Sequence, residues 1–243
     1  MKRKRFFIAL TSGLALLLAM ASSAMAKPMA TPAPPDINPA NFVPQVSNPF
    51  FPLKPGTTFY YQGTADGIPT SNVTHVTHDT KQILGVTTTV VHDKAFDNGV
   101  LVEDTFDWYA QDVDGNVWYF GEDSKELDAN GNVISTEGSW EAGVEGAQPG
   151  IIMLAHPQVG DRYYQEFASG VAEDQARVLS LDESACVRYK RRCFDNLLLT
   201  KEWTQLEPGV TENKYYARNV GFVLGVMVKG GDERTELVKI STE

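Results

Sequence analysis

Short runs of β-branched and aromatic residues, separated by glycine, aspartate and asparagine turns, fill the chain from Pro52 to its end. Runs of this kind place alternate side chains on two faces and are typical of strands. No window carries a sustained helical repeat with capping residues, although Val171–Val178 is compatible with a short helix. The sequence therefore predicts a single all-β domain, an antiparallel sandwich or barrel of meander hairpins with at most short helices.

The turn Asp112–Asn116 joins two aromatic strands and constrains one hairpin in detail. A three-residue loop closed by Gly115 would pair Ala110 with Trp118 and would collect the apolar side chains on one face. A one-residue slip would mix the two faces, and a buried face selects against mixing. We therefore predict the three-residue loop and one dry face. The other face would carry Glu103, Thr105, Asp107, Tyr109, Gln111, Val117 and Tyr119.

The polar face of this hairpin is the best candidate for a binding site. In a closed or half-closed sheet, one face lines a cavity instead of facing water. The alternative is a solvated outer face whose tyrosines reflect strand propensity. The glycine-rich segment Gly138–Gly150 is either a lid over this face or a connection plugged by Trp140. The predicted ligand-binding residues are Glu103, Asp107, Tyr109, Tyr119 and Trp140.

Calcium is the one cofactor that the sequence leaves open. Asp112, Asp114 and Asn116 occupy alternate positions, as the first ligands of a calcium-binding loop do. Such a loop needs glycine at its sixth position and glutamate at its twelfth, where this chain has Val117 and Asp123. Turn formation explains the same residues, so a calcium-stabilised module stays an alternative.

Two histidines, His75 and His78, have the spacing of a metal pair on a helix. In a strand, residues three apart point to opposite faces. We therefore expect no zinc site at this pair.

Cys186 and Cys193 enclose six residues, four of which are basic. In an oxidising compartment two cysteines at this spacing are expected to form a disulfide. We predict a hairpin stapled across a basic tip. The spacing differs from the Cys-x-x-Cys spacing of redox-active pairs.

The first 26 residues have the features of a secretory signal peptide. Lys2–Arg5 is basic, Phe6–Met20 is largely apolar, and Ala24–Ala26 offers small residues for cleavage. The apolar run is shorter than the roughly 20 residues that cross a bilayer. We therefore expect a periplasmic or secreted protein without a membrane span after cleavage. A proline-rich extended arm would cover residues 27–50, and the β domain residues 51–243.

The net charge of −10 limits the partners of the chain. Loss of the leader would remove four basic residues and no acid, and would make the charge more negative still. Such a body repels nucleic acid and is disfavoured at anionic membrane surfaces. We expect a small-molecule or envelope partner and no nucleic acid.

The usual signatures of enzymes are absent from the sequence: it has no nucleophile elbow, phosphate-binding loop or His-Glu-x-x-His motif. We therefore expect an exported, soluble, non-enzymatic protein that binds a small or apolar ligand or an envelope partner through the aromatic and acidic face. A carboxylate-dependent, glycosidase-like hydrolase is the alternative, because such enzymes use paired acids.

Four segments carry a resemblance to other proteins: Glu103–Asp112, Asp114–Asp123, Gly138–Gly150 and Glu212–Ala217. On these segments the chain resembles a group of uncharacterised exported bacterial proteins rich in β structure. The resemblance implies export and a β-rich fold, and it implies no activity or site.

Overall fold

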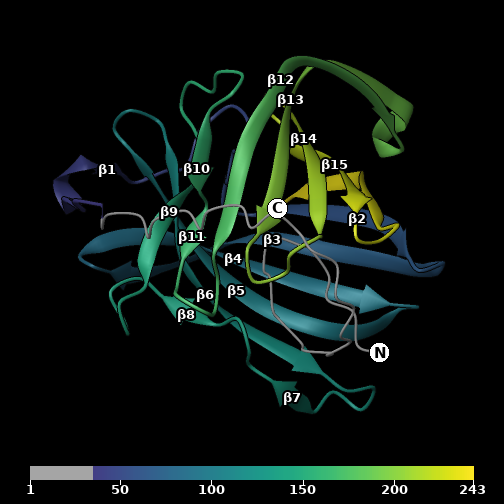
Figure 1. The fold of residues 1–243 in the computed structure, drawn as a ribbon, viewed down its shortest axis with the longest axis horizontal. Helices are drawn as coiled ribbons and strands as arrows, with labels where there is room; N and C mark the ends of the chain where they lie inside the picture. The colour runs from purple at the N-terminus through teal and green to yellow at the C-terminus, as the bar shows by residue number, and fades with distance from the viewer. Residues whose placement is uncertain (1–34) are drawn as a thin grey trace, which may run out of the picture.

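The structure, a computed structural model, describes residues 35–243 and consists of one antiparallel system of strands (Figure 1). The predicted signal peptide and the first part of the proline-rich arm lie outside the described residues. Within residues 35–243, no helix is long and apolar enough to span a membrane. The strands are β1 (Phe42–Val43), β2 (Thr57–Ala65), β3 (Ile68–Ile83), β4 (Val86–Asp97), β5 (Val100–Asp112), β6 (Val117–Leu127), β7 (Val133–Ser135), β8 (Trp140–Glu141), β9 (Gln148–Met153), β10 (Arg162–Tyr164), β11 (Glu166–Phe167), β12 (Asp174–Val187), β13 (Arg192–Thr204), β14 (Thr211–Ala217), β15 (Gly221–Lys229) and β16 (Arg234–Thr242), with 3₁₀ turns η1 (Pro39–Asn41) and η2 (Tyr189–Arg191).

The sheet runs in the order β10-β12-β13-β14-β15-β16-β2-β3-β4-β5-β6-β9-β11 and curls so that its two ends meet. β10 and β11 are separated only by Gln165, whose N–H donates to the carbonyl of Asp174 at 2.8 Å. One short stretch of chain thus pairs with β12 on one side and with β9 on the other, and nearly closes a barrel. The predicted all-β class is confirmed, and its form is barrel-like.

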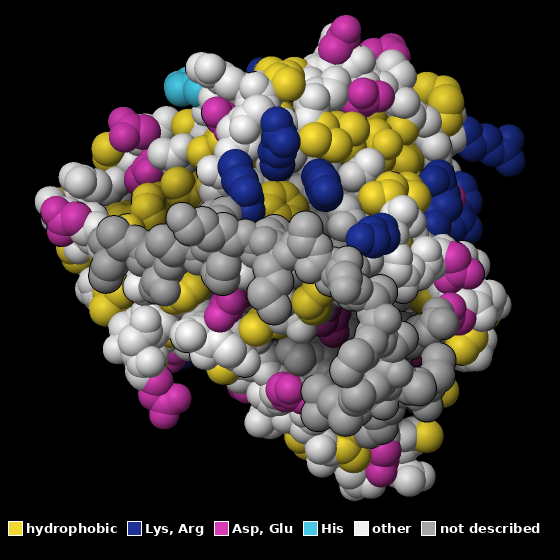
Figure 2. Space-filling view, viewed as in Figure 1, with side chains coloured by type: hydrophobic (Ala, Val, Ile, Leu, Met, Phe, Trp, Pro, Cys, Tyr) yellow, Lys and Arg dark blue, Asp and Glu magenta, His cyan; other side chains and the backbone are white. Residues whose placement is uncertain are grey.

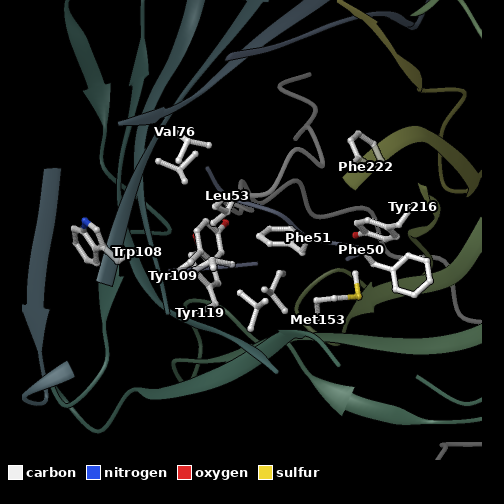
Figure 3. Packing of buried hydrophobic residues seen from close by; sticks show 14 of the residues in the cluster. Phe50, Phe51, Leu53, Val76, Trp108, Tyr109, Tyr119, Met153, Tyr216 and Phe222 are labelled. Atoms are coloured by element: carbon white, nitrogen blue, oxygen red, sulfur yellow. The ribbon is translucent and has the colours of Figure 1, made fainter. Parts of the chain in front are cut away.

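Residues 35–53 lie against the barrel. β1 pairs with the end of β5, and Phe42 packs edge-on against Phe120 at 5.6 Å between ring centroids. Phe50, Phe51 and Leu53 are buried in the hydrophobic core (Figure 3). The segment therefore supplies apolar contacts both outside and inside the sheet.

The β5–β6 hairpin has the predicted three-residue loop, since Ala110 pairs with Trp118. One step further along, the register shifts: Tyr109 pairs with Tyr119, but Asp107 pairs with Glu122. The extra residue on β6 is a β-bulge, and Gly121 there has φ +129°, a conformation that favours glycine. A Cβ at Gly121 would lie 2.2 Å from the carbonyl oxygen of Trp140, so the close approach of β8 also requires glycine.

The two faces of this hairpin separate as predicted, but the prediction that only the apolar face is dry was wrong. The polar set faces the barrel interior: Asp107, Tyr109 and Tyr119 are each 1% exposed. Trp108 lies on the other side of its strand and is also buried (Figure 3). The outer face is covered in part by β1, whose Phe42 contacts Trp118 and Phe120, and Trp118 stays half-exposed.

Two further expectations concern the second half of the chain. The predicted disulfide joins Cys186 on β12 to Cys193 on β13, directly across the hairpin. The helix considered for Val171–Val178 does not form, because β12 begins at Asp174 and pairs there with β13.

Candidate functional site

The barrel interior on the β3–β6 side holds a group of acidic and aromatic side chains, here called the acid–phenol cluster, which are buried except for the half-buried Glu103. Its members come from five strands: Asp93 from β4, Glu103, Asp107 and Tyr109 from β5, Tyr119 and Glu122 from β6, Trp140 from β8, and Glu166 from β11.

Asp107 and Glu122 form the centre of the acid–phenol cluster. They lie directly opposite each other on neighbouring strands, and each is 1% exposed. The Tyr119 hydroxyl oxygen lies 2.7 Å from Oδ1 of Asp107 and 3.1 Å from Oε2 of Glu122. A phenol has one proton to donate, whereas a protonated carboxyl can donate to the phenol oxygen. Both hydrogen bonds at the Tyr119 hydroxyl can therefore form at the same time when one of the two acids is protonated.

Aromatic rings surround this centre. Tyr109 stacks on Tyr119, with ring centroids 4.7 Å apart and planes 17° apart, and Trp140 meets Tyr119 edge-on at 5.5 Å. Phe51 packs edge-on against Tyr109 at 5.3 Å. The indole N–H of Trp140 donates to Oε2 of Glu166 at 2.9 Å. Trp140 therefore has both an apolar contact and a hydrogen bond inside the barrel.

Asp93 lies at one margin of the acid–phenol cluster. The Thr74 hydroxyl donates to Oδ2 of Asp93 at 2.7 Å, and the Asn72 amide donates to Oδ1. Burial raises the pKa of Asp93 to about 6, although both hydrogen bonds oppose the shift.

Glu103 lies next to Asp93 and accepts a hydrogen bond from the Thr105 hydroxyl at 3.1 Å. Burial raises the pKa of Glu103 to about 7, with a further contribution from the charge of Asp93. Both carboxyl groups thus keep protons at pH values where exposed acids have lost them.

No lysine, arginine or histidine of residues 35–243 forms an ion pair with any of the five acids in the acid–phenol cluster. Burial raises the pKa of Asp107, Glu122 and Glu166 well above the ordinary values. Neighbouring carboxylates raise it further, Asp93 for Asp107 and Glu166 for Glu122. The acids therefore avoid mutual repulsion by holding protons.

Two atoms of the acid–phenol cluster are buried without a hydrogen bond of ordinary geometry in the described part of the chain: the hydroxyl oxygen of Tyr109, which lies close enough to Asp107 to act against the rise in its pKa, and Oε1 of Glu122. Leaving a buried polar group unsatisfied costs about 1–3 kcal/mol. These two atoms are where the cluster can accept a further hydrogen-bonding group.

A second polar cluster, here called the lysine cluster, lies inside the barrel on β12–β14 and consists of Asp174, Glu202, Glu212, Lys214 and Tyr216. Lys214 Nζ lies 2.8 Å from Oε2 of Glu202 and 3.6 Å from Oε2 of Glu212. The Tyr216 hydroxyl donates to Glu202 at 3.1 Å. Here a buried cation balances a buried carboxylate.

The pKa values in the lysine cluster show how many of its acids Lys214 can keep charged. Burial lowers the pKa of Lys214, but the carboxylates of Glu202 and Glu212 outweigh it and leave that pKa raised. Burial raises the pKa of Glu212 to about 8 and that of Asp174 to about 7, although Lys214 opposes both shifts. One lysine therefore stabilises one charged carboxylate, and the remaining acids keep protons.

The predicted calcium residues form a hydrogen-bonded turn. Asp112 accepts from the backbone and side-chain nitrogens of Asn116 at 2.8 and 2.9 Å, and from the Trp118 indole at 2.8 Å. Asn116 Oδ1 accepts from the N–H of Ala155 at 2.9 Å. In residues 35–243, no group of three or more acidic, histidine or cysteine side chains is arranged to hold a metal ion. Calcium binding at Asp112, Asp114 and Asn116 stays a prediction.

The expectation that His75 and His78 point apart was wrong. His78 Nε2 lies 3.2 Å from Oε2 of Glu243, and His75 Nε2 lies 3.9 Å from Oε1 of the same residue. An irregularity in β3 between Val76 and Thr80 breaks the alternation and turns both rings to one side.

All five predicted ligand-binding residues lie in the acid–phenol cluster. The segment Gly138–Gly150 forms β8 and the start of β9, and Trp140 is buried within it. The predicted set of ligand-binding residues did not include Glu122, Asp93 or Glu166. Gly121 within a strand was the available signal for Glu122, because an isolated glycine marks a bulge that reverses the alternation. Nothing local indicated Asp93 or Glu166, which come from separate strands.

The comparisons with known proteins add little to this description. No protein-family model matches the chain, and neither does any curated protein. One similar solved structure is a Bacteroides fragilis protein described as exported with a YmcC-like fold, at 17% identity and a TM-score of 0.46, covering 79% of this chain and 99% of that one. Another is a Parabacteroides distasonis protein described as a lipoprotein, at 10% identity and a TM-score of 0.42, covering 79% and 98%.

Proposed function

We propose that the chain is an exported, non-enzymatic binding protein that holds a small, partly apolar ligand at the acid–phenol cluster. Export rests on the signal-peptide features of residues 1–26, which lie outside the described residues. The binding site rests on the geometry of the barrel interior.

The observation that carries this proposal is the pair of buried atoms that make no hydrogen bond of ordinary geometry within residues 35–243, the Tyr109 hydroxyl and Oε1 of Glu122. Most buried polar atoms in folded proteins are hydrogen-bonded, and the exceptions call for an explanation. A ligand that bonds to these two atoms would remove the cost of leaving them unsatisfied. Their position beside stacked rings gives the same ligand an apolar surface to contact.

The charges indicate the polar group of the ligand. The five acids of the acid–phenol cluster have no basic partner in the part of the chain that the structure describes, so a group that donates hydrogen bonds or carries positive charge fits there. The rings of Tyr109, Tyr119 and Trp140 can contact an apolar part and can also attract a cation. An aromatic or aliphatic ammonium compound combines these properties, and an alcohol has the donor without the charge.

Calorimetric titration with benzylammonium, benzyl alcohol and benzoate tests this proposal. At pH 8, above the raised pKa values of about 6 for Asp93 and about 7 for Glu103, we expect benzylammonium to bind, benzyl alcohol to bind more weakly, and benzoate not to bind, because its carboxylate would face ionised acids. Tyr109→Phe removes one hydrogen bond, which corresponds to about a tenfold loss of benzylammonium affinity.

The control is Tyr215→Phe, which removes a half-buried phenol on β14, outside the acid–phenol cluster. It should leave benzylammonium affinity unchanged. Failure of all three probes to bind the parent protein would contradict the proposal, and so would equal losses of affinity in the two variants.

A further inference from the structure

The β12–β13 hairpin continues beyond the body of the sheet. Its pairs with β10 reach Arg177, and its pairs with β14 reach Leu198. Between these residues and the tip, β12 and β13 pair with each other, and the ribbon arches over towards β2 and β16 (Figure 1). The tip is thus a separate surface, remote in sequence from the acid–phenol cluster.

The tip is fixed in place at its base. The Cys186–Cys193 disulfide links the two strands, and Val187 next to it is buried. Arg188 bonds to Glu236, its Nε lying 2.8 Å from Oε1 and its backbone N–H 3.0 Å from Oε2. A guanidinium nitrogen of Arg188 also donates to the carbonyl of Gln62 at 3.2 Å. Arg188 therefore anchors the tip to the barrel.

The three basic residues that follow are free of such contacts. Lys190, Arg191 and Arg192 are exposed, and none forms an ion pair with a carboxylate of residues 35–243. Lys190 and Arg191 have φ of 51° and 49°, a left-handed conformation that is uncommon for residues other than glycine. Figure 2 shows Lys and Arg side chains standing out at the edge where Figure 1 draws this tip. Within residues 35–243 these three cations therefore have no carboxylate partner at the end of the braced hairpin, although Lys190 lies over the Tyr189 ring and Arg192 over the Phe194 ring.

We propose that this tip is a contact for a membrane surface that contains anionic phospholipid. The chain as a whole is acidic, with a net charge of −10, and its body is repelled by such a surface. A contact through a tip avoids that repulsion, because charges further than about 10 Å away are screened at moderate salt. Tyr189 at the tip is half-buried and packs against the hydrophobic core, so the basic side chains make the proposed contact.

Vesicle sedimentation with the mature protein tests the membrane contact. The vesicles are phosphatidylcholine alone or phosphatidylcholine mixed with phosphatidylglycerol, at low ionic strength. We expect binding only to the mixed vesicles. The variant Lys190→Gln/Arg191→Gln should bind them about 30-fold more weakly, since each basic residue near the surface contributes about fivefold.

The matched control is Arg177→Gln/Lys201→Gln, which removes the same charge from an exposed cross-strand pair on the same hairpin. It should change binding less than about twofold, because these residues lie away from the tip. Equal losses in the two variants would show that net charge alone governs binding and would overturn the proposal. So would equal binding to both kinds of vesicle, or none by the parent protein. Thermal denaturation verifies that each variant is folded, and benzylammonium titration reports on the acid–phenol cluster separately.

Discussion

The acid–phenol cluster and the lysine cluster line the same barrel, and both bury carboxyl groups, but they neutralise them in different ways. In the lysine cluster, Lys214 lies 2.8 Å from Glu202 and forms a buried ion pair. In the acid–phenol cluster, Asp107 and Glu122 lie opposite each other and share the Tyr119 hydroxyl. In the lysine cluster a cation balances one carboxylate and protons neutralise the other acids, whereas in the acid–phenol cluster protons alone neutralise the acids.

This difference shows how a barrel of this kind can bury so many acids. A buried ion pair contributes little net stability, but removing one partner is expensive. A buried protonated acid behaves as a neutral hydrogen-bonding group while the pH stays below its raised pKa. Both clusters should therefore respond to pH through their protonated acids, but only the lysine cluster depends on a single buried cation and should be destabilised strongly by its removal.

Removal of the buried cation, Lys214, should cause the largest loss in the free energy of unfolding. Lys214→Met leaves Glu202 and Glu212 without their partner, so we expect a loss of about 3–5 kcal/mol in the free energy of unfolding at pH 7. Urea denaturation measures it. Lys125→Met, which breaks a half-exposed pair with Asp123, should cost less than about 1 kcal/mol. Similar small losses in both variants would remove the distinction between the clusters.

A change of pH should alter the free energy of unfolding mainly through the protonated acids. The folded-state pKa values of Asp93 and Glu103, about 6 and about 7, lie above those of unfolded acids. The folded state therefore binds more protons, and its stability is full below about pH 4 and falls as the pH rises through 6 and 7. For Asp93 alone, the rise from 3.8 to about 6 corresponds to about 3 kcal/mol.

Glu122→Gln tests this origin of the pH dependence. The amide has the shape of a protonated carboxyl and cannot ionise, so unfolding free energies measured between pH 5 and 8 should fall less steeply than in the parent. Asp128→Asn is the control, because Asp128 is exposed and hydrogen bonds from Asn132 lower its pKa. A parent protein whose stability rises with pH over this range would contradict the protonated state of the acid–phenol cluster.

Removal of the Tyr119 or the Tyr216 hydroxyl, each of which bonds to carboxyl groups, should lower the free energy of unfolding by smaller amounts. Tyr119→Phe deprives both Asp107 and Glu122 of their shared hydroxyl, and should cost about 1–3 kcal/mol in unfolding free energy. Tyr216→Phe should cost about 1 kcal/mol, because Glu202 keeps Lys214 and the Thr200 hydroxyl. Urea denaturation at pH 6 measures both. A larger loss for Tyr216→Phe would reverse the comparison.

Local patterns in the sequence were sufficient for the class of fold and for much of the acid–phenol cluster. The Asp112–Asn116 turn set the register near the loop, and alternation along β5 brought Asp107 and Tyr109 to one face. The Cys186–Cys193 spacing was likewise enough for the disulfide. Each of these inferences depends on residues close together in the chain.

The remaining features depend on irregularities and distant contacts. The irregularity in β3 reversed the expected direction of a histidine, and the bulge in β6 brought Glu122 inside. Closure of the sheet brought Glu166 of β11 to Trp140 of β8. A strict two-residue period cannot represent a bulge, and no single segment reveals which strands a closed sheet will join.

The bulge at Gly121 has a consequence for how the interior could change during evolution. Beyond it, β6 is out of phase with its first half, so that Glu122 and Ser124 face inward, where an uninterrupted strand would present Gly121 and Asp123. The polarity of half a strand thus depends on a single residue without a side chain. A relative that lost this glycine would have to rewrite the inward-facing positions from 122 to 126 together, instead of one at a time.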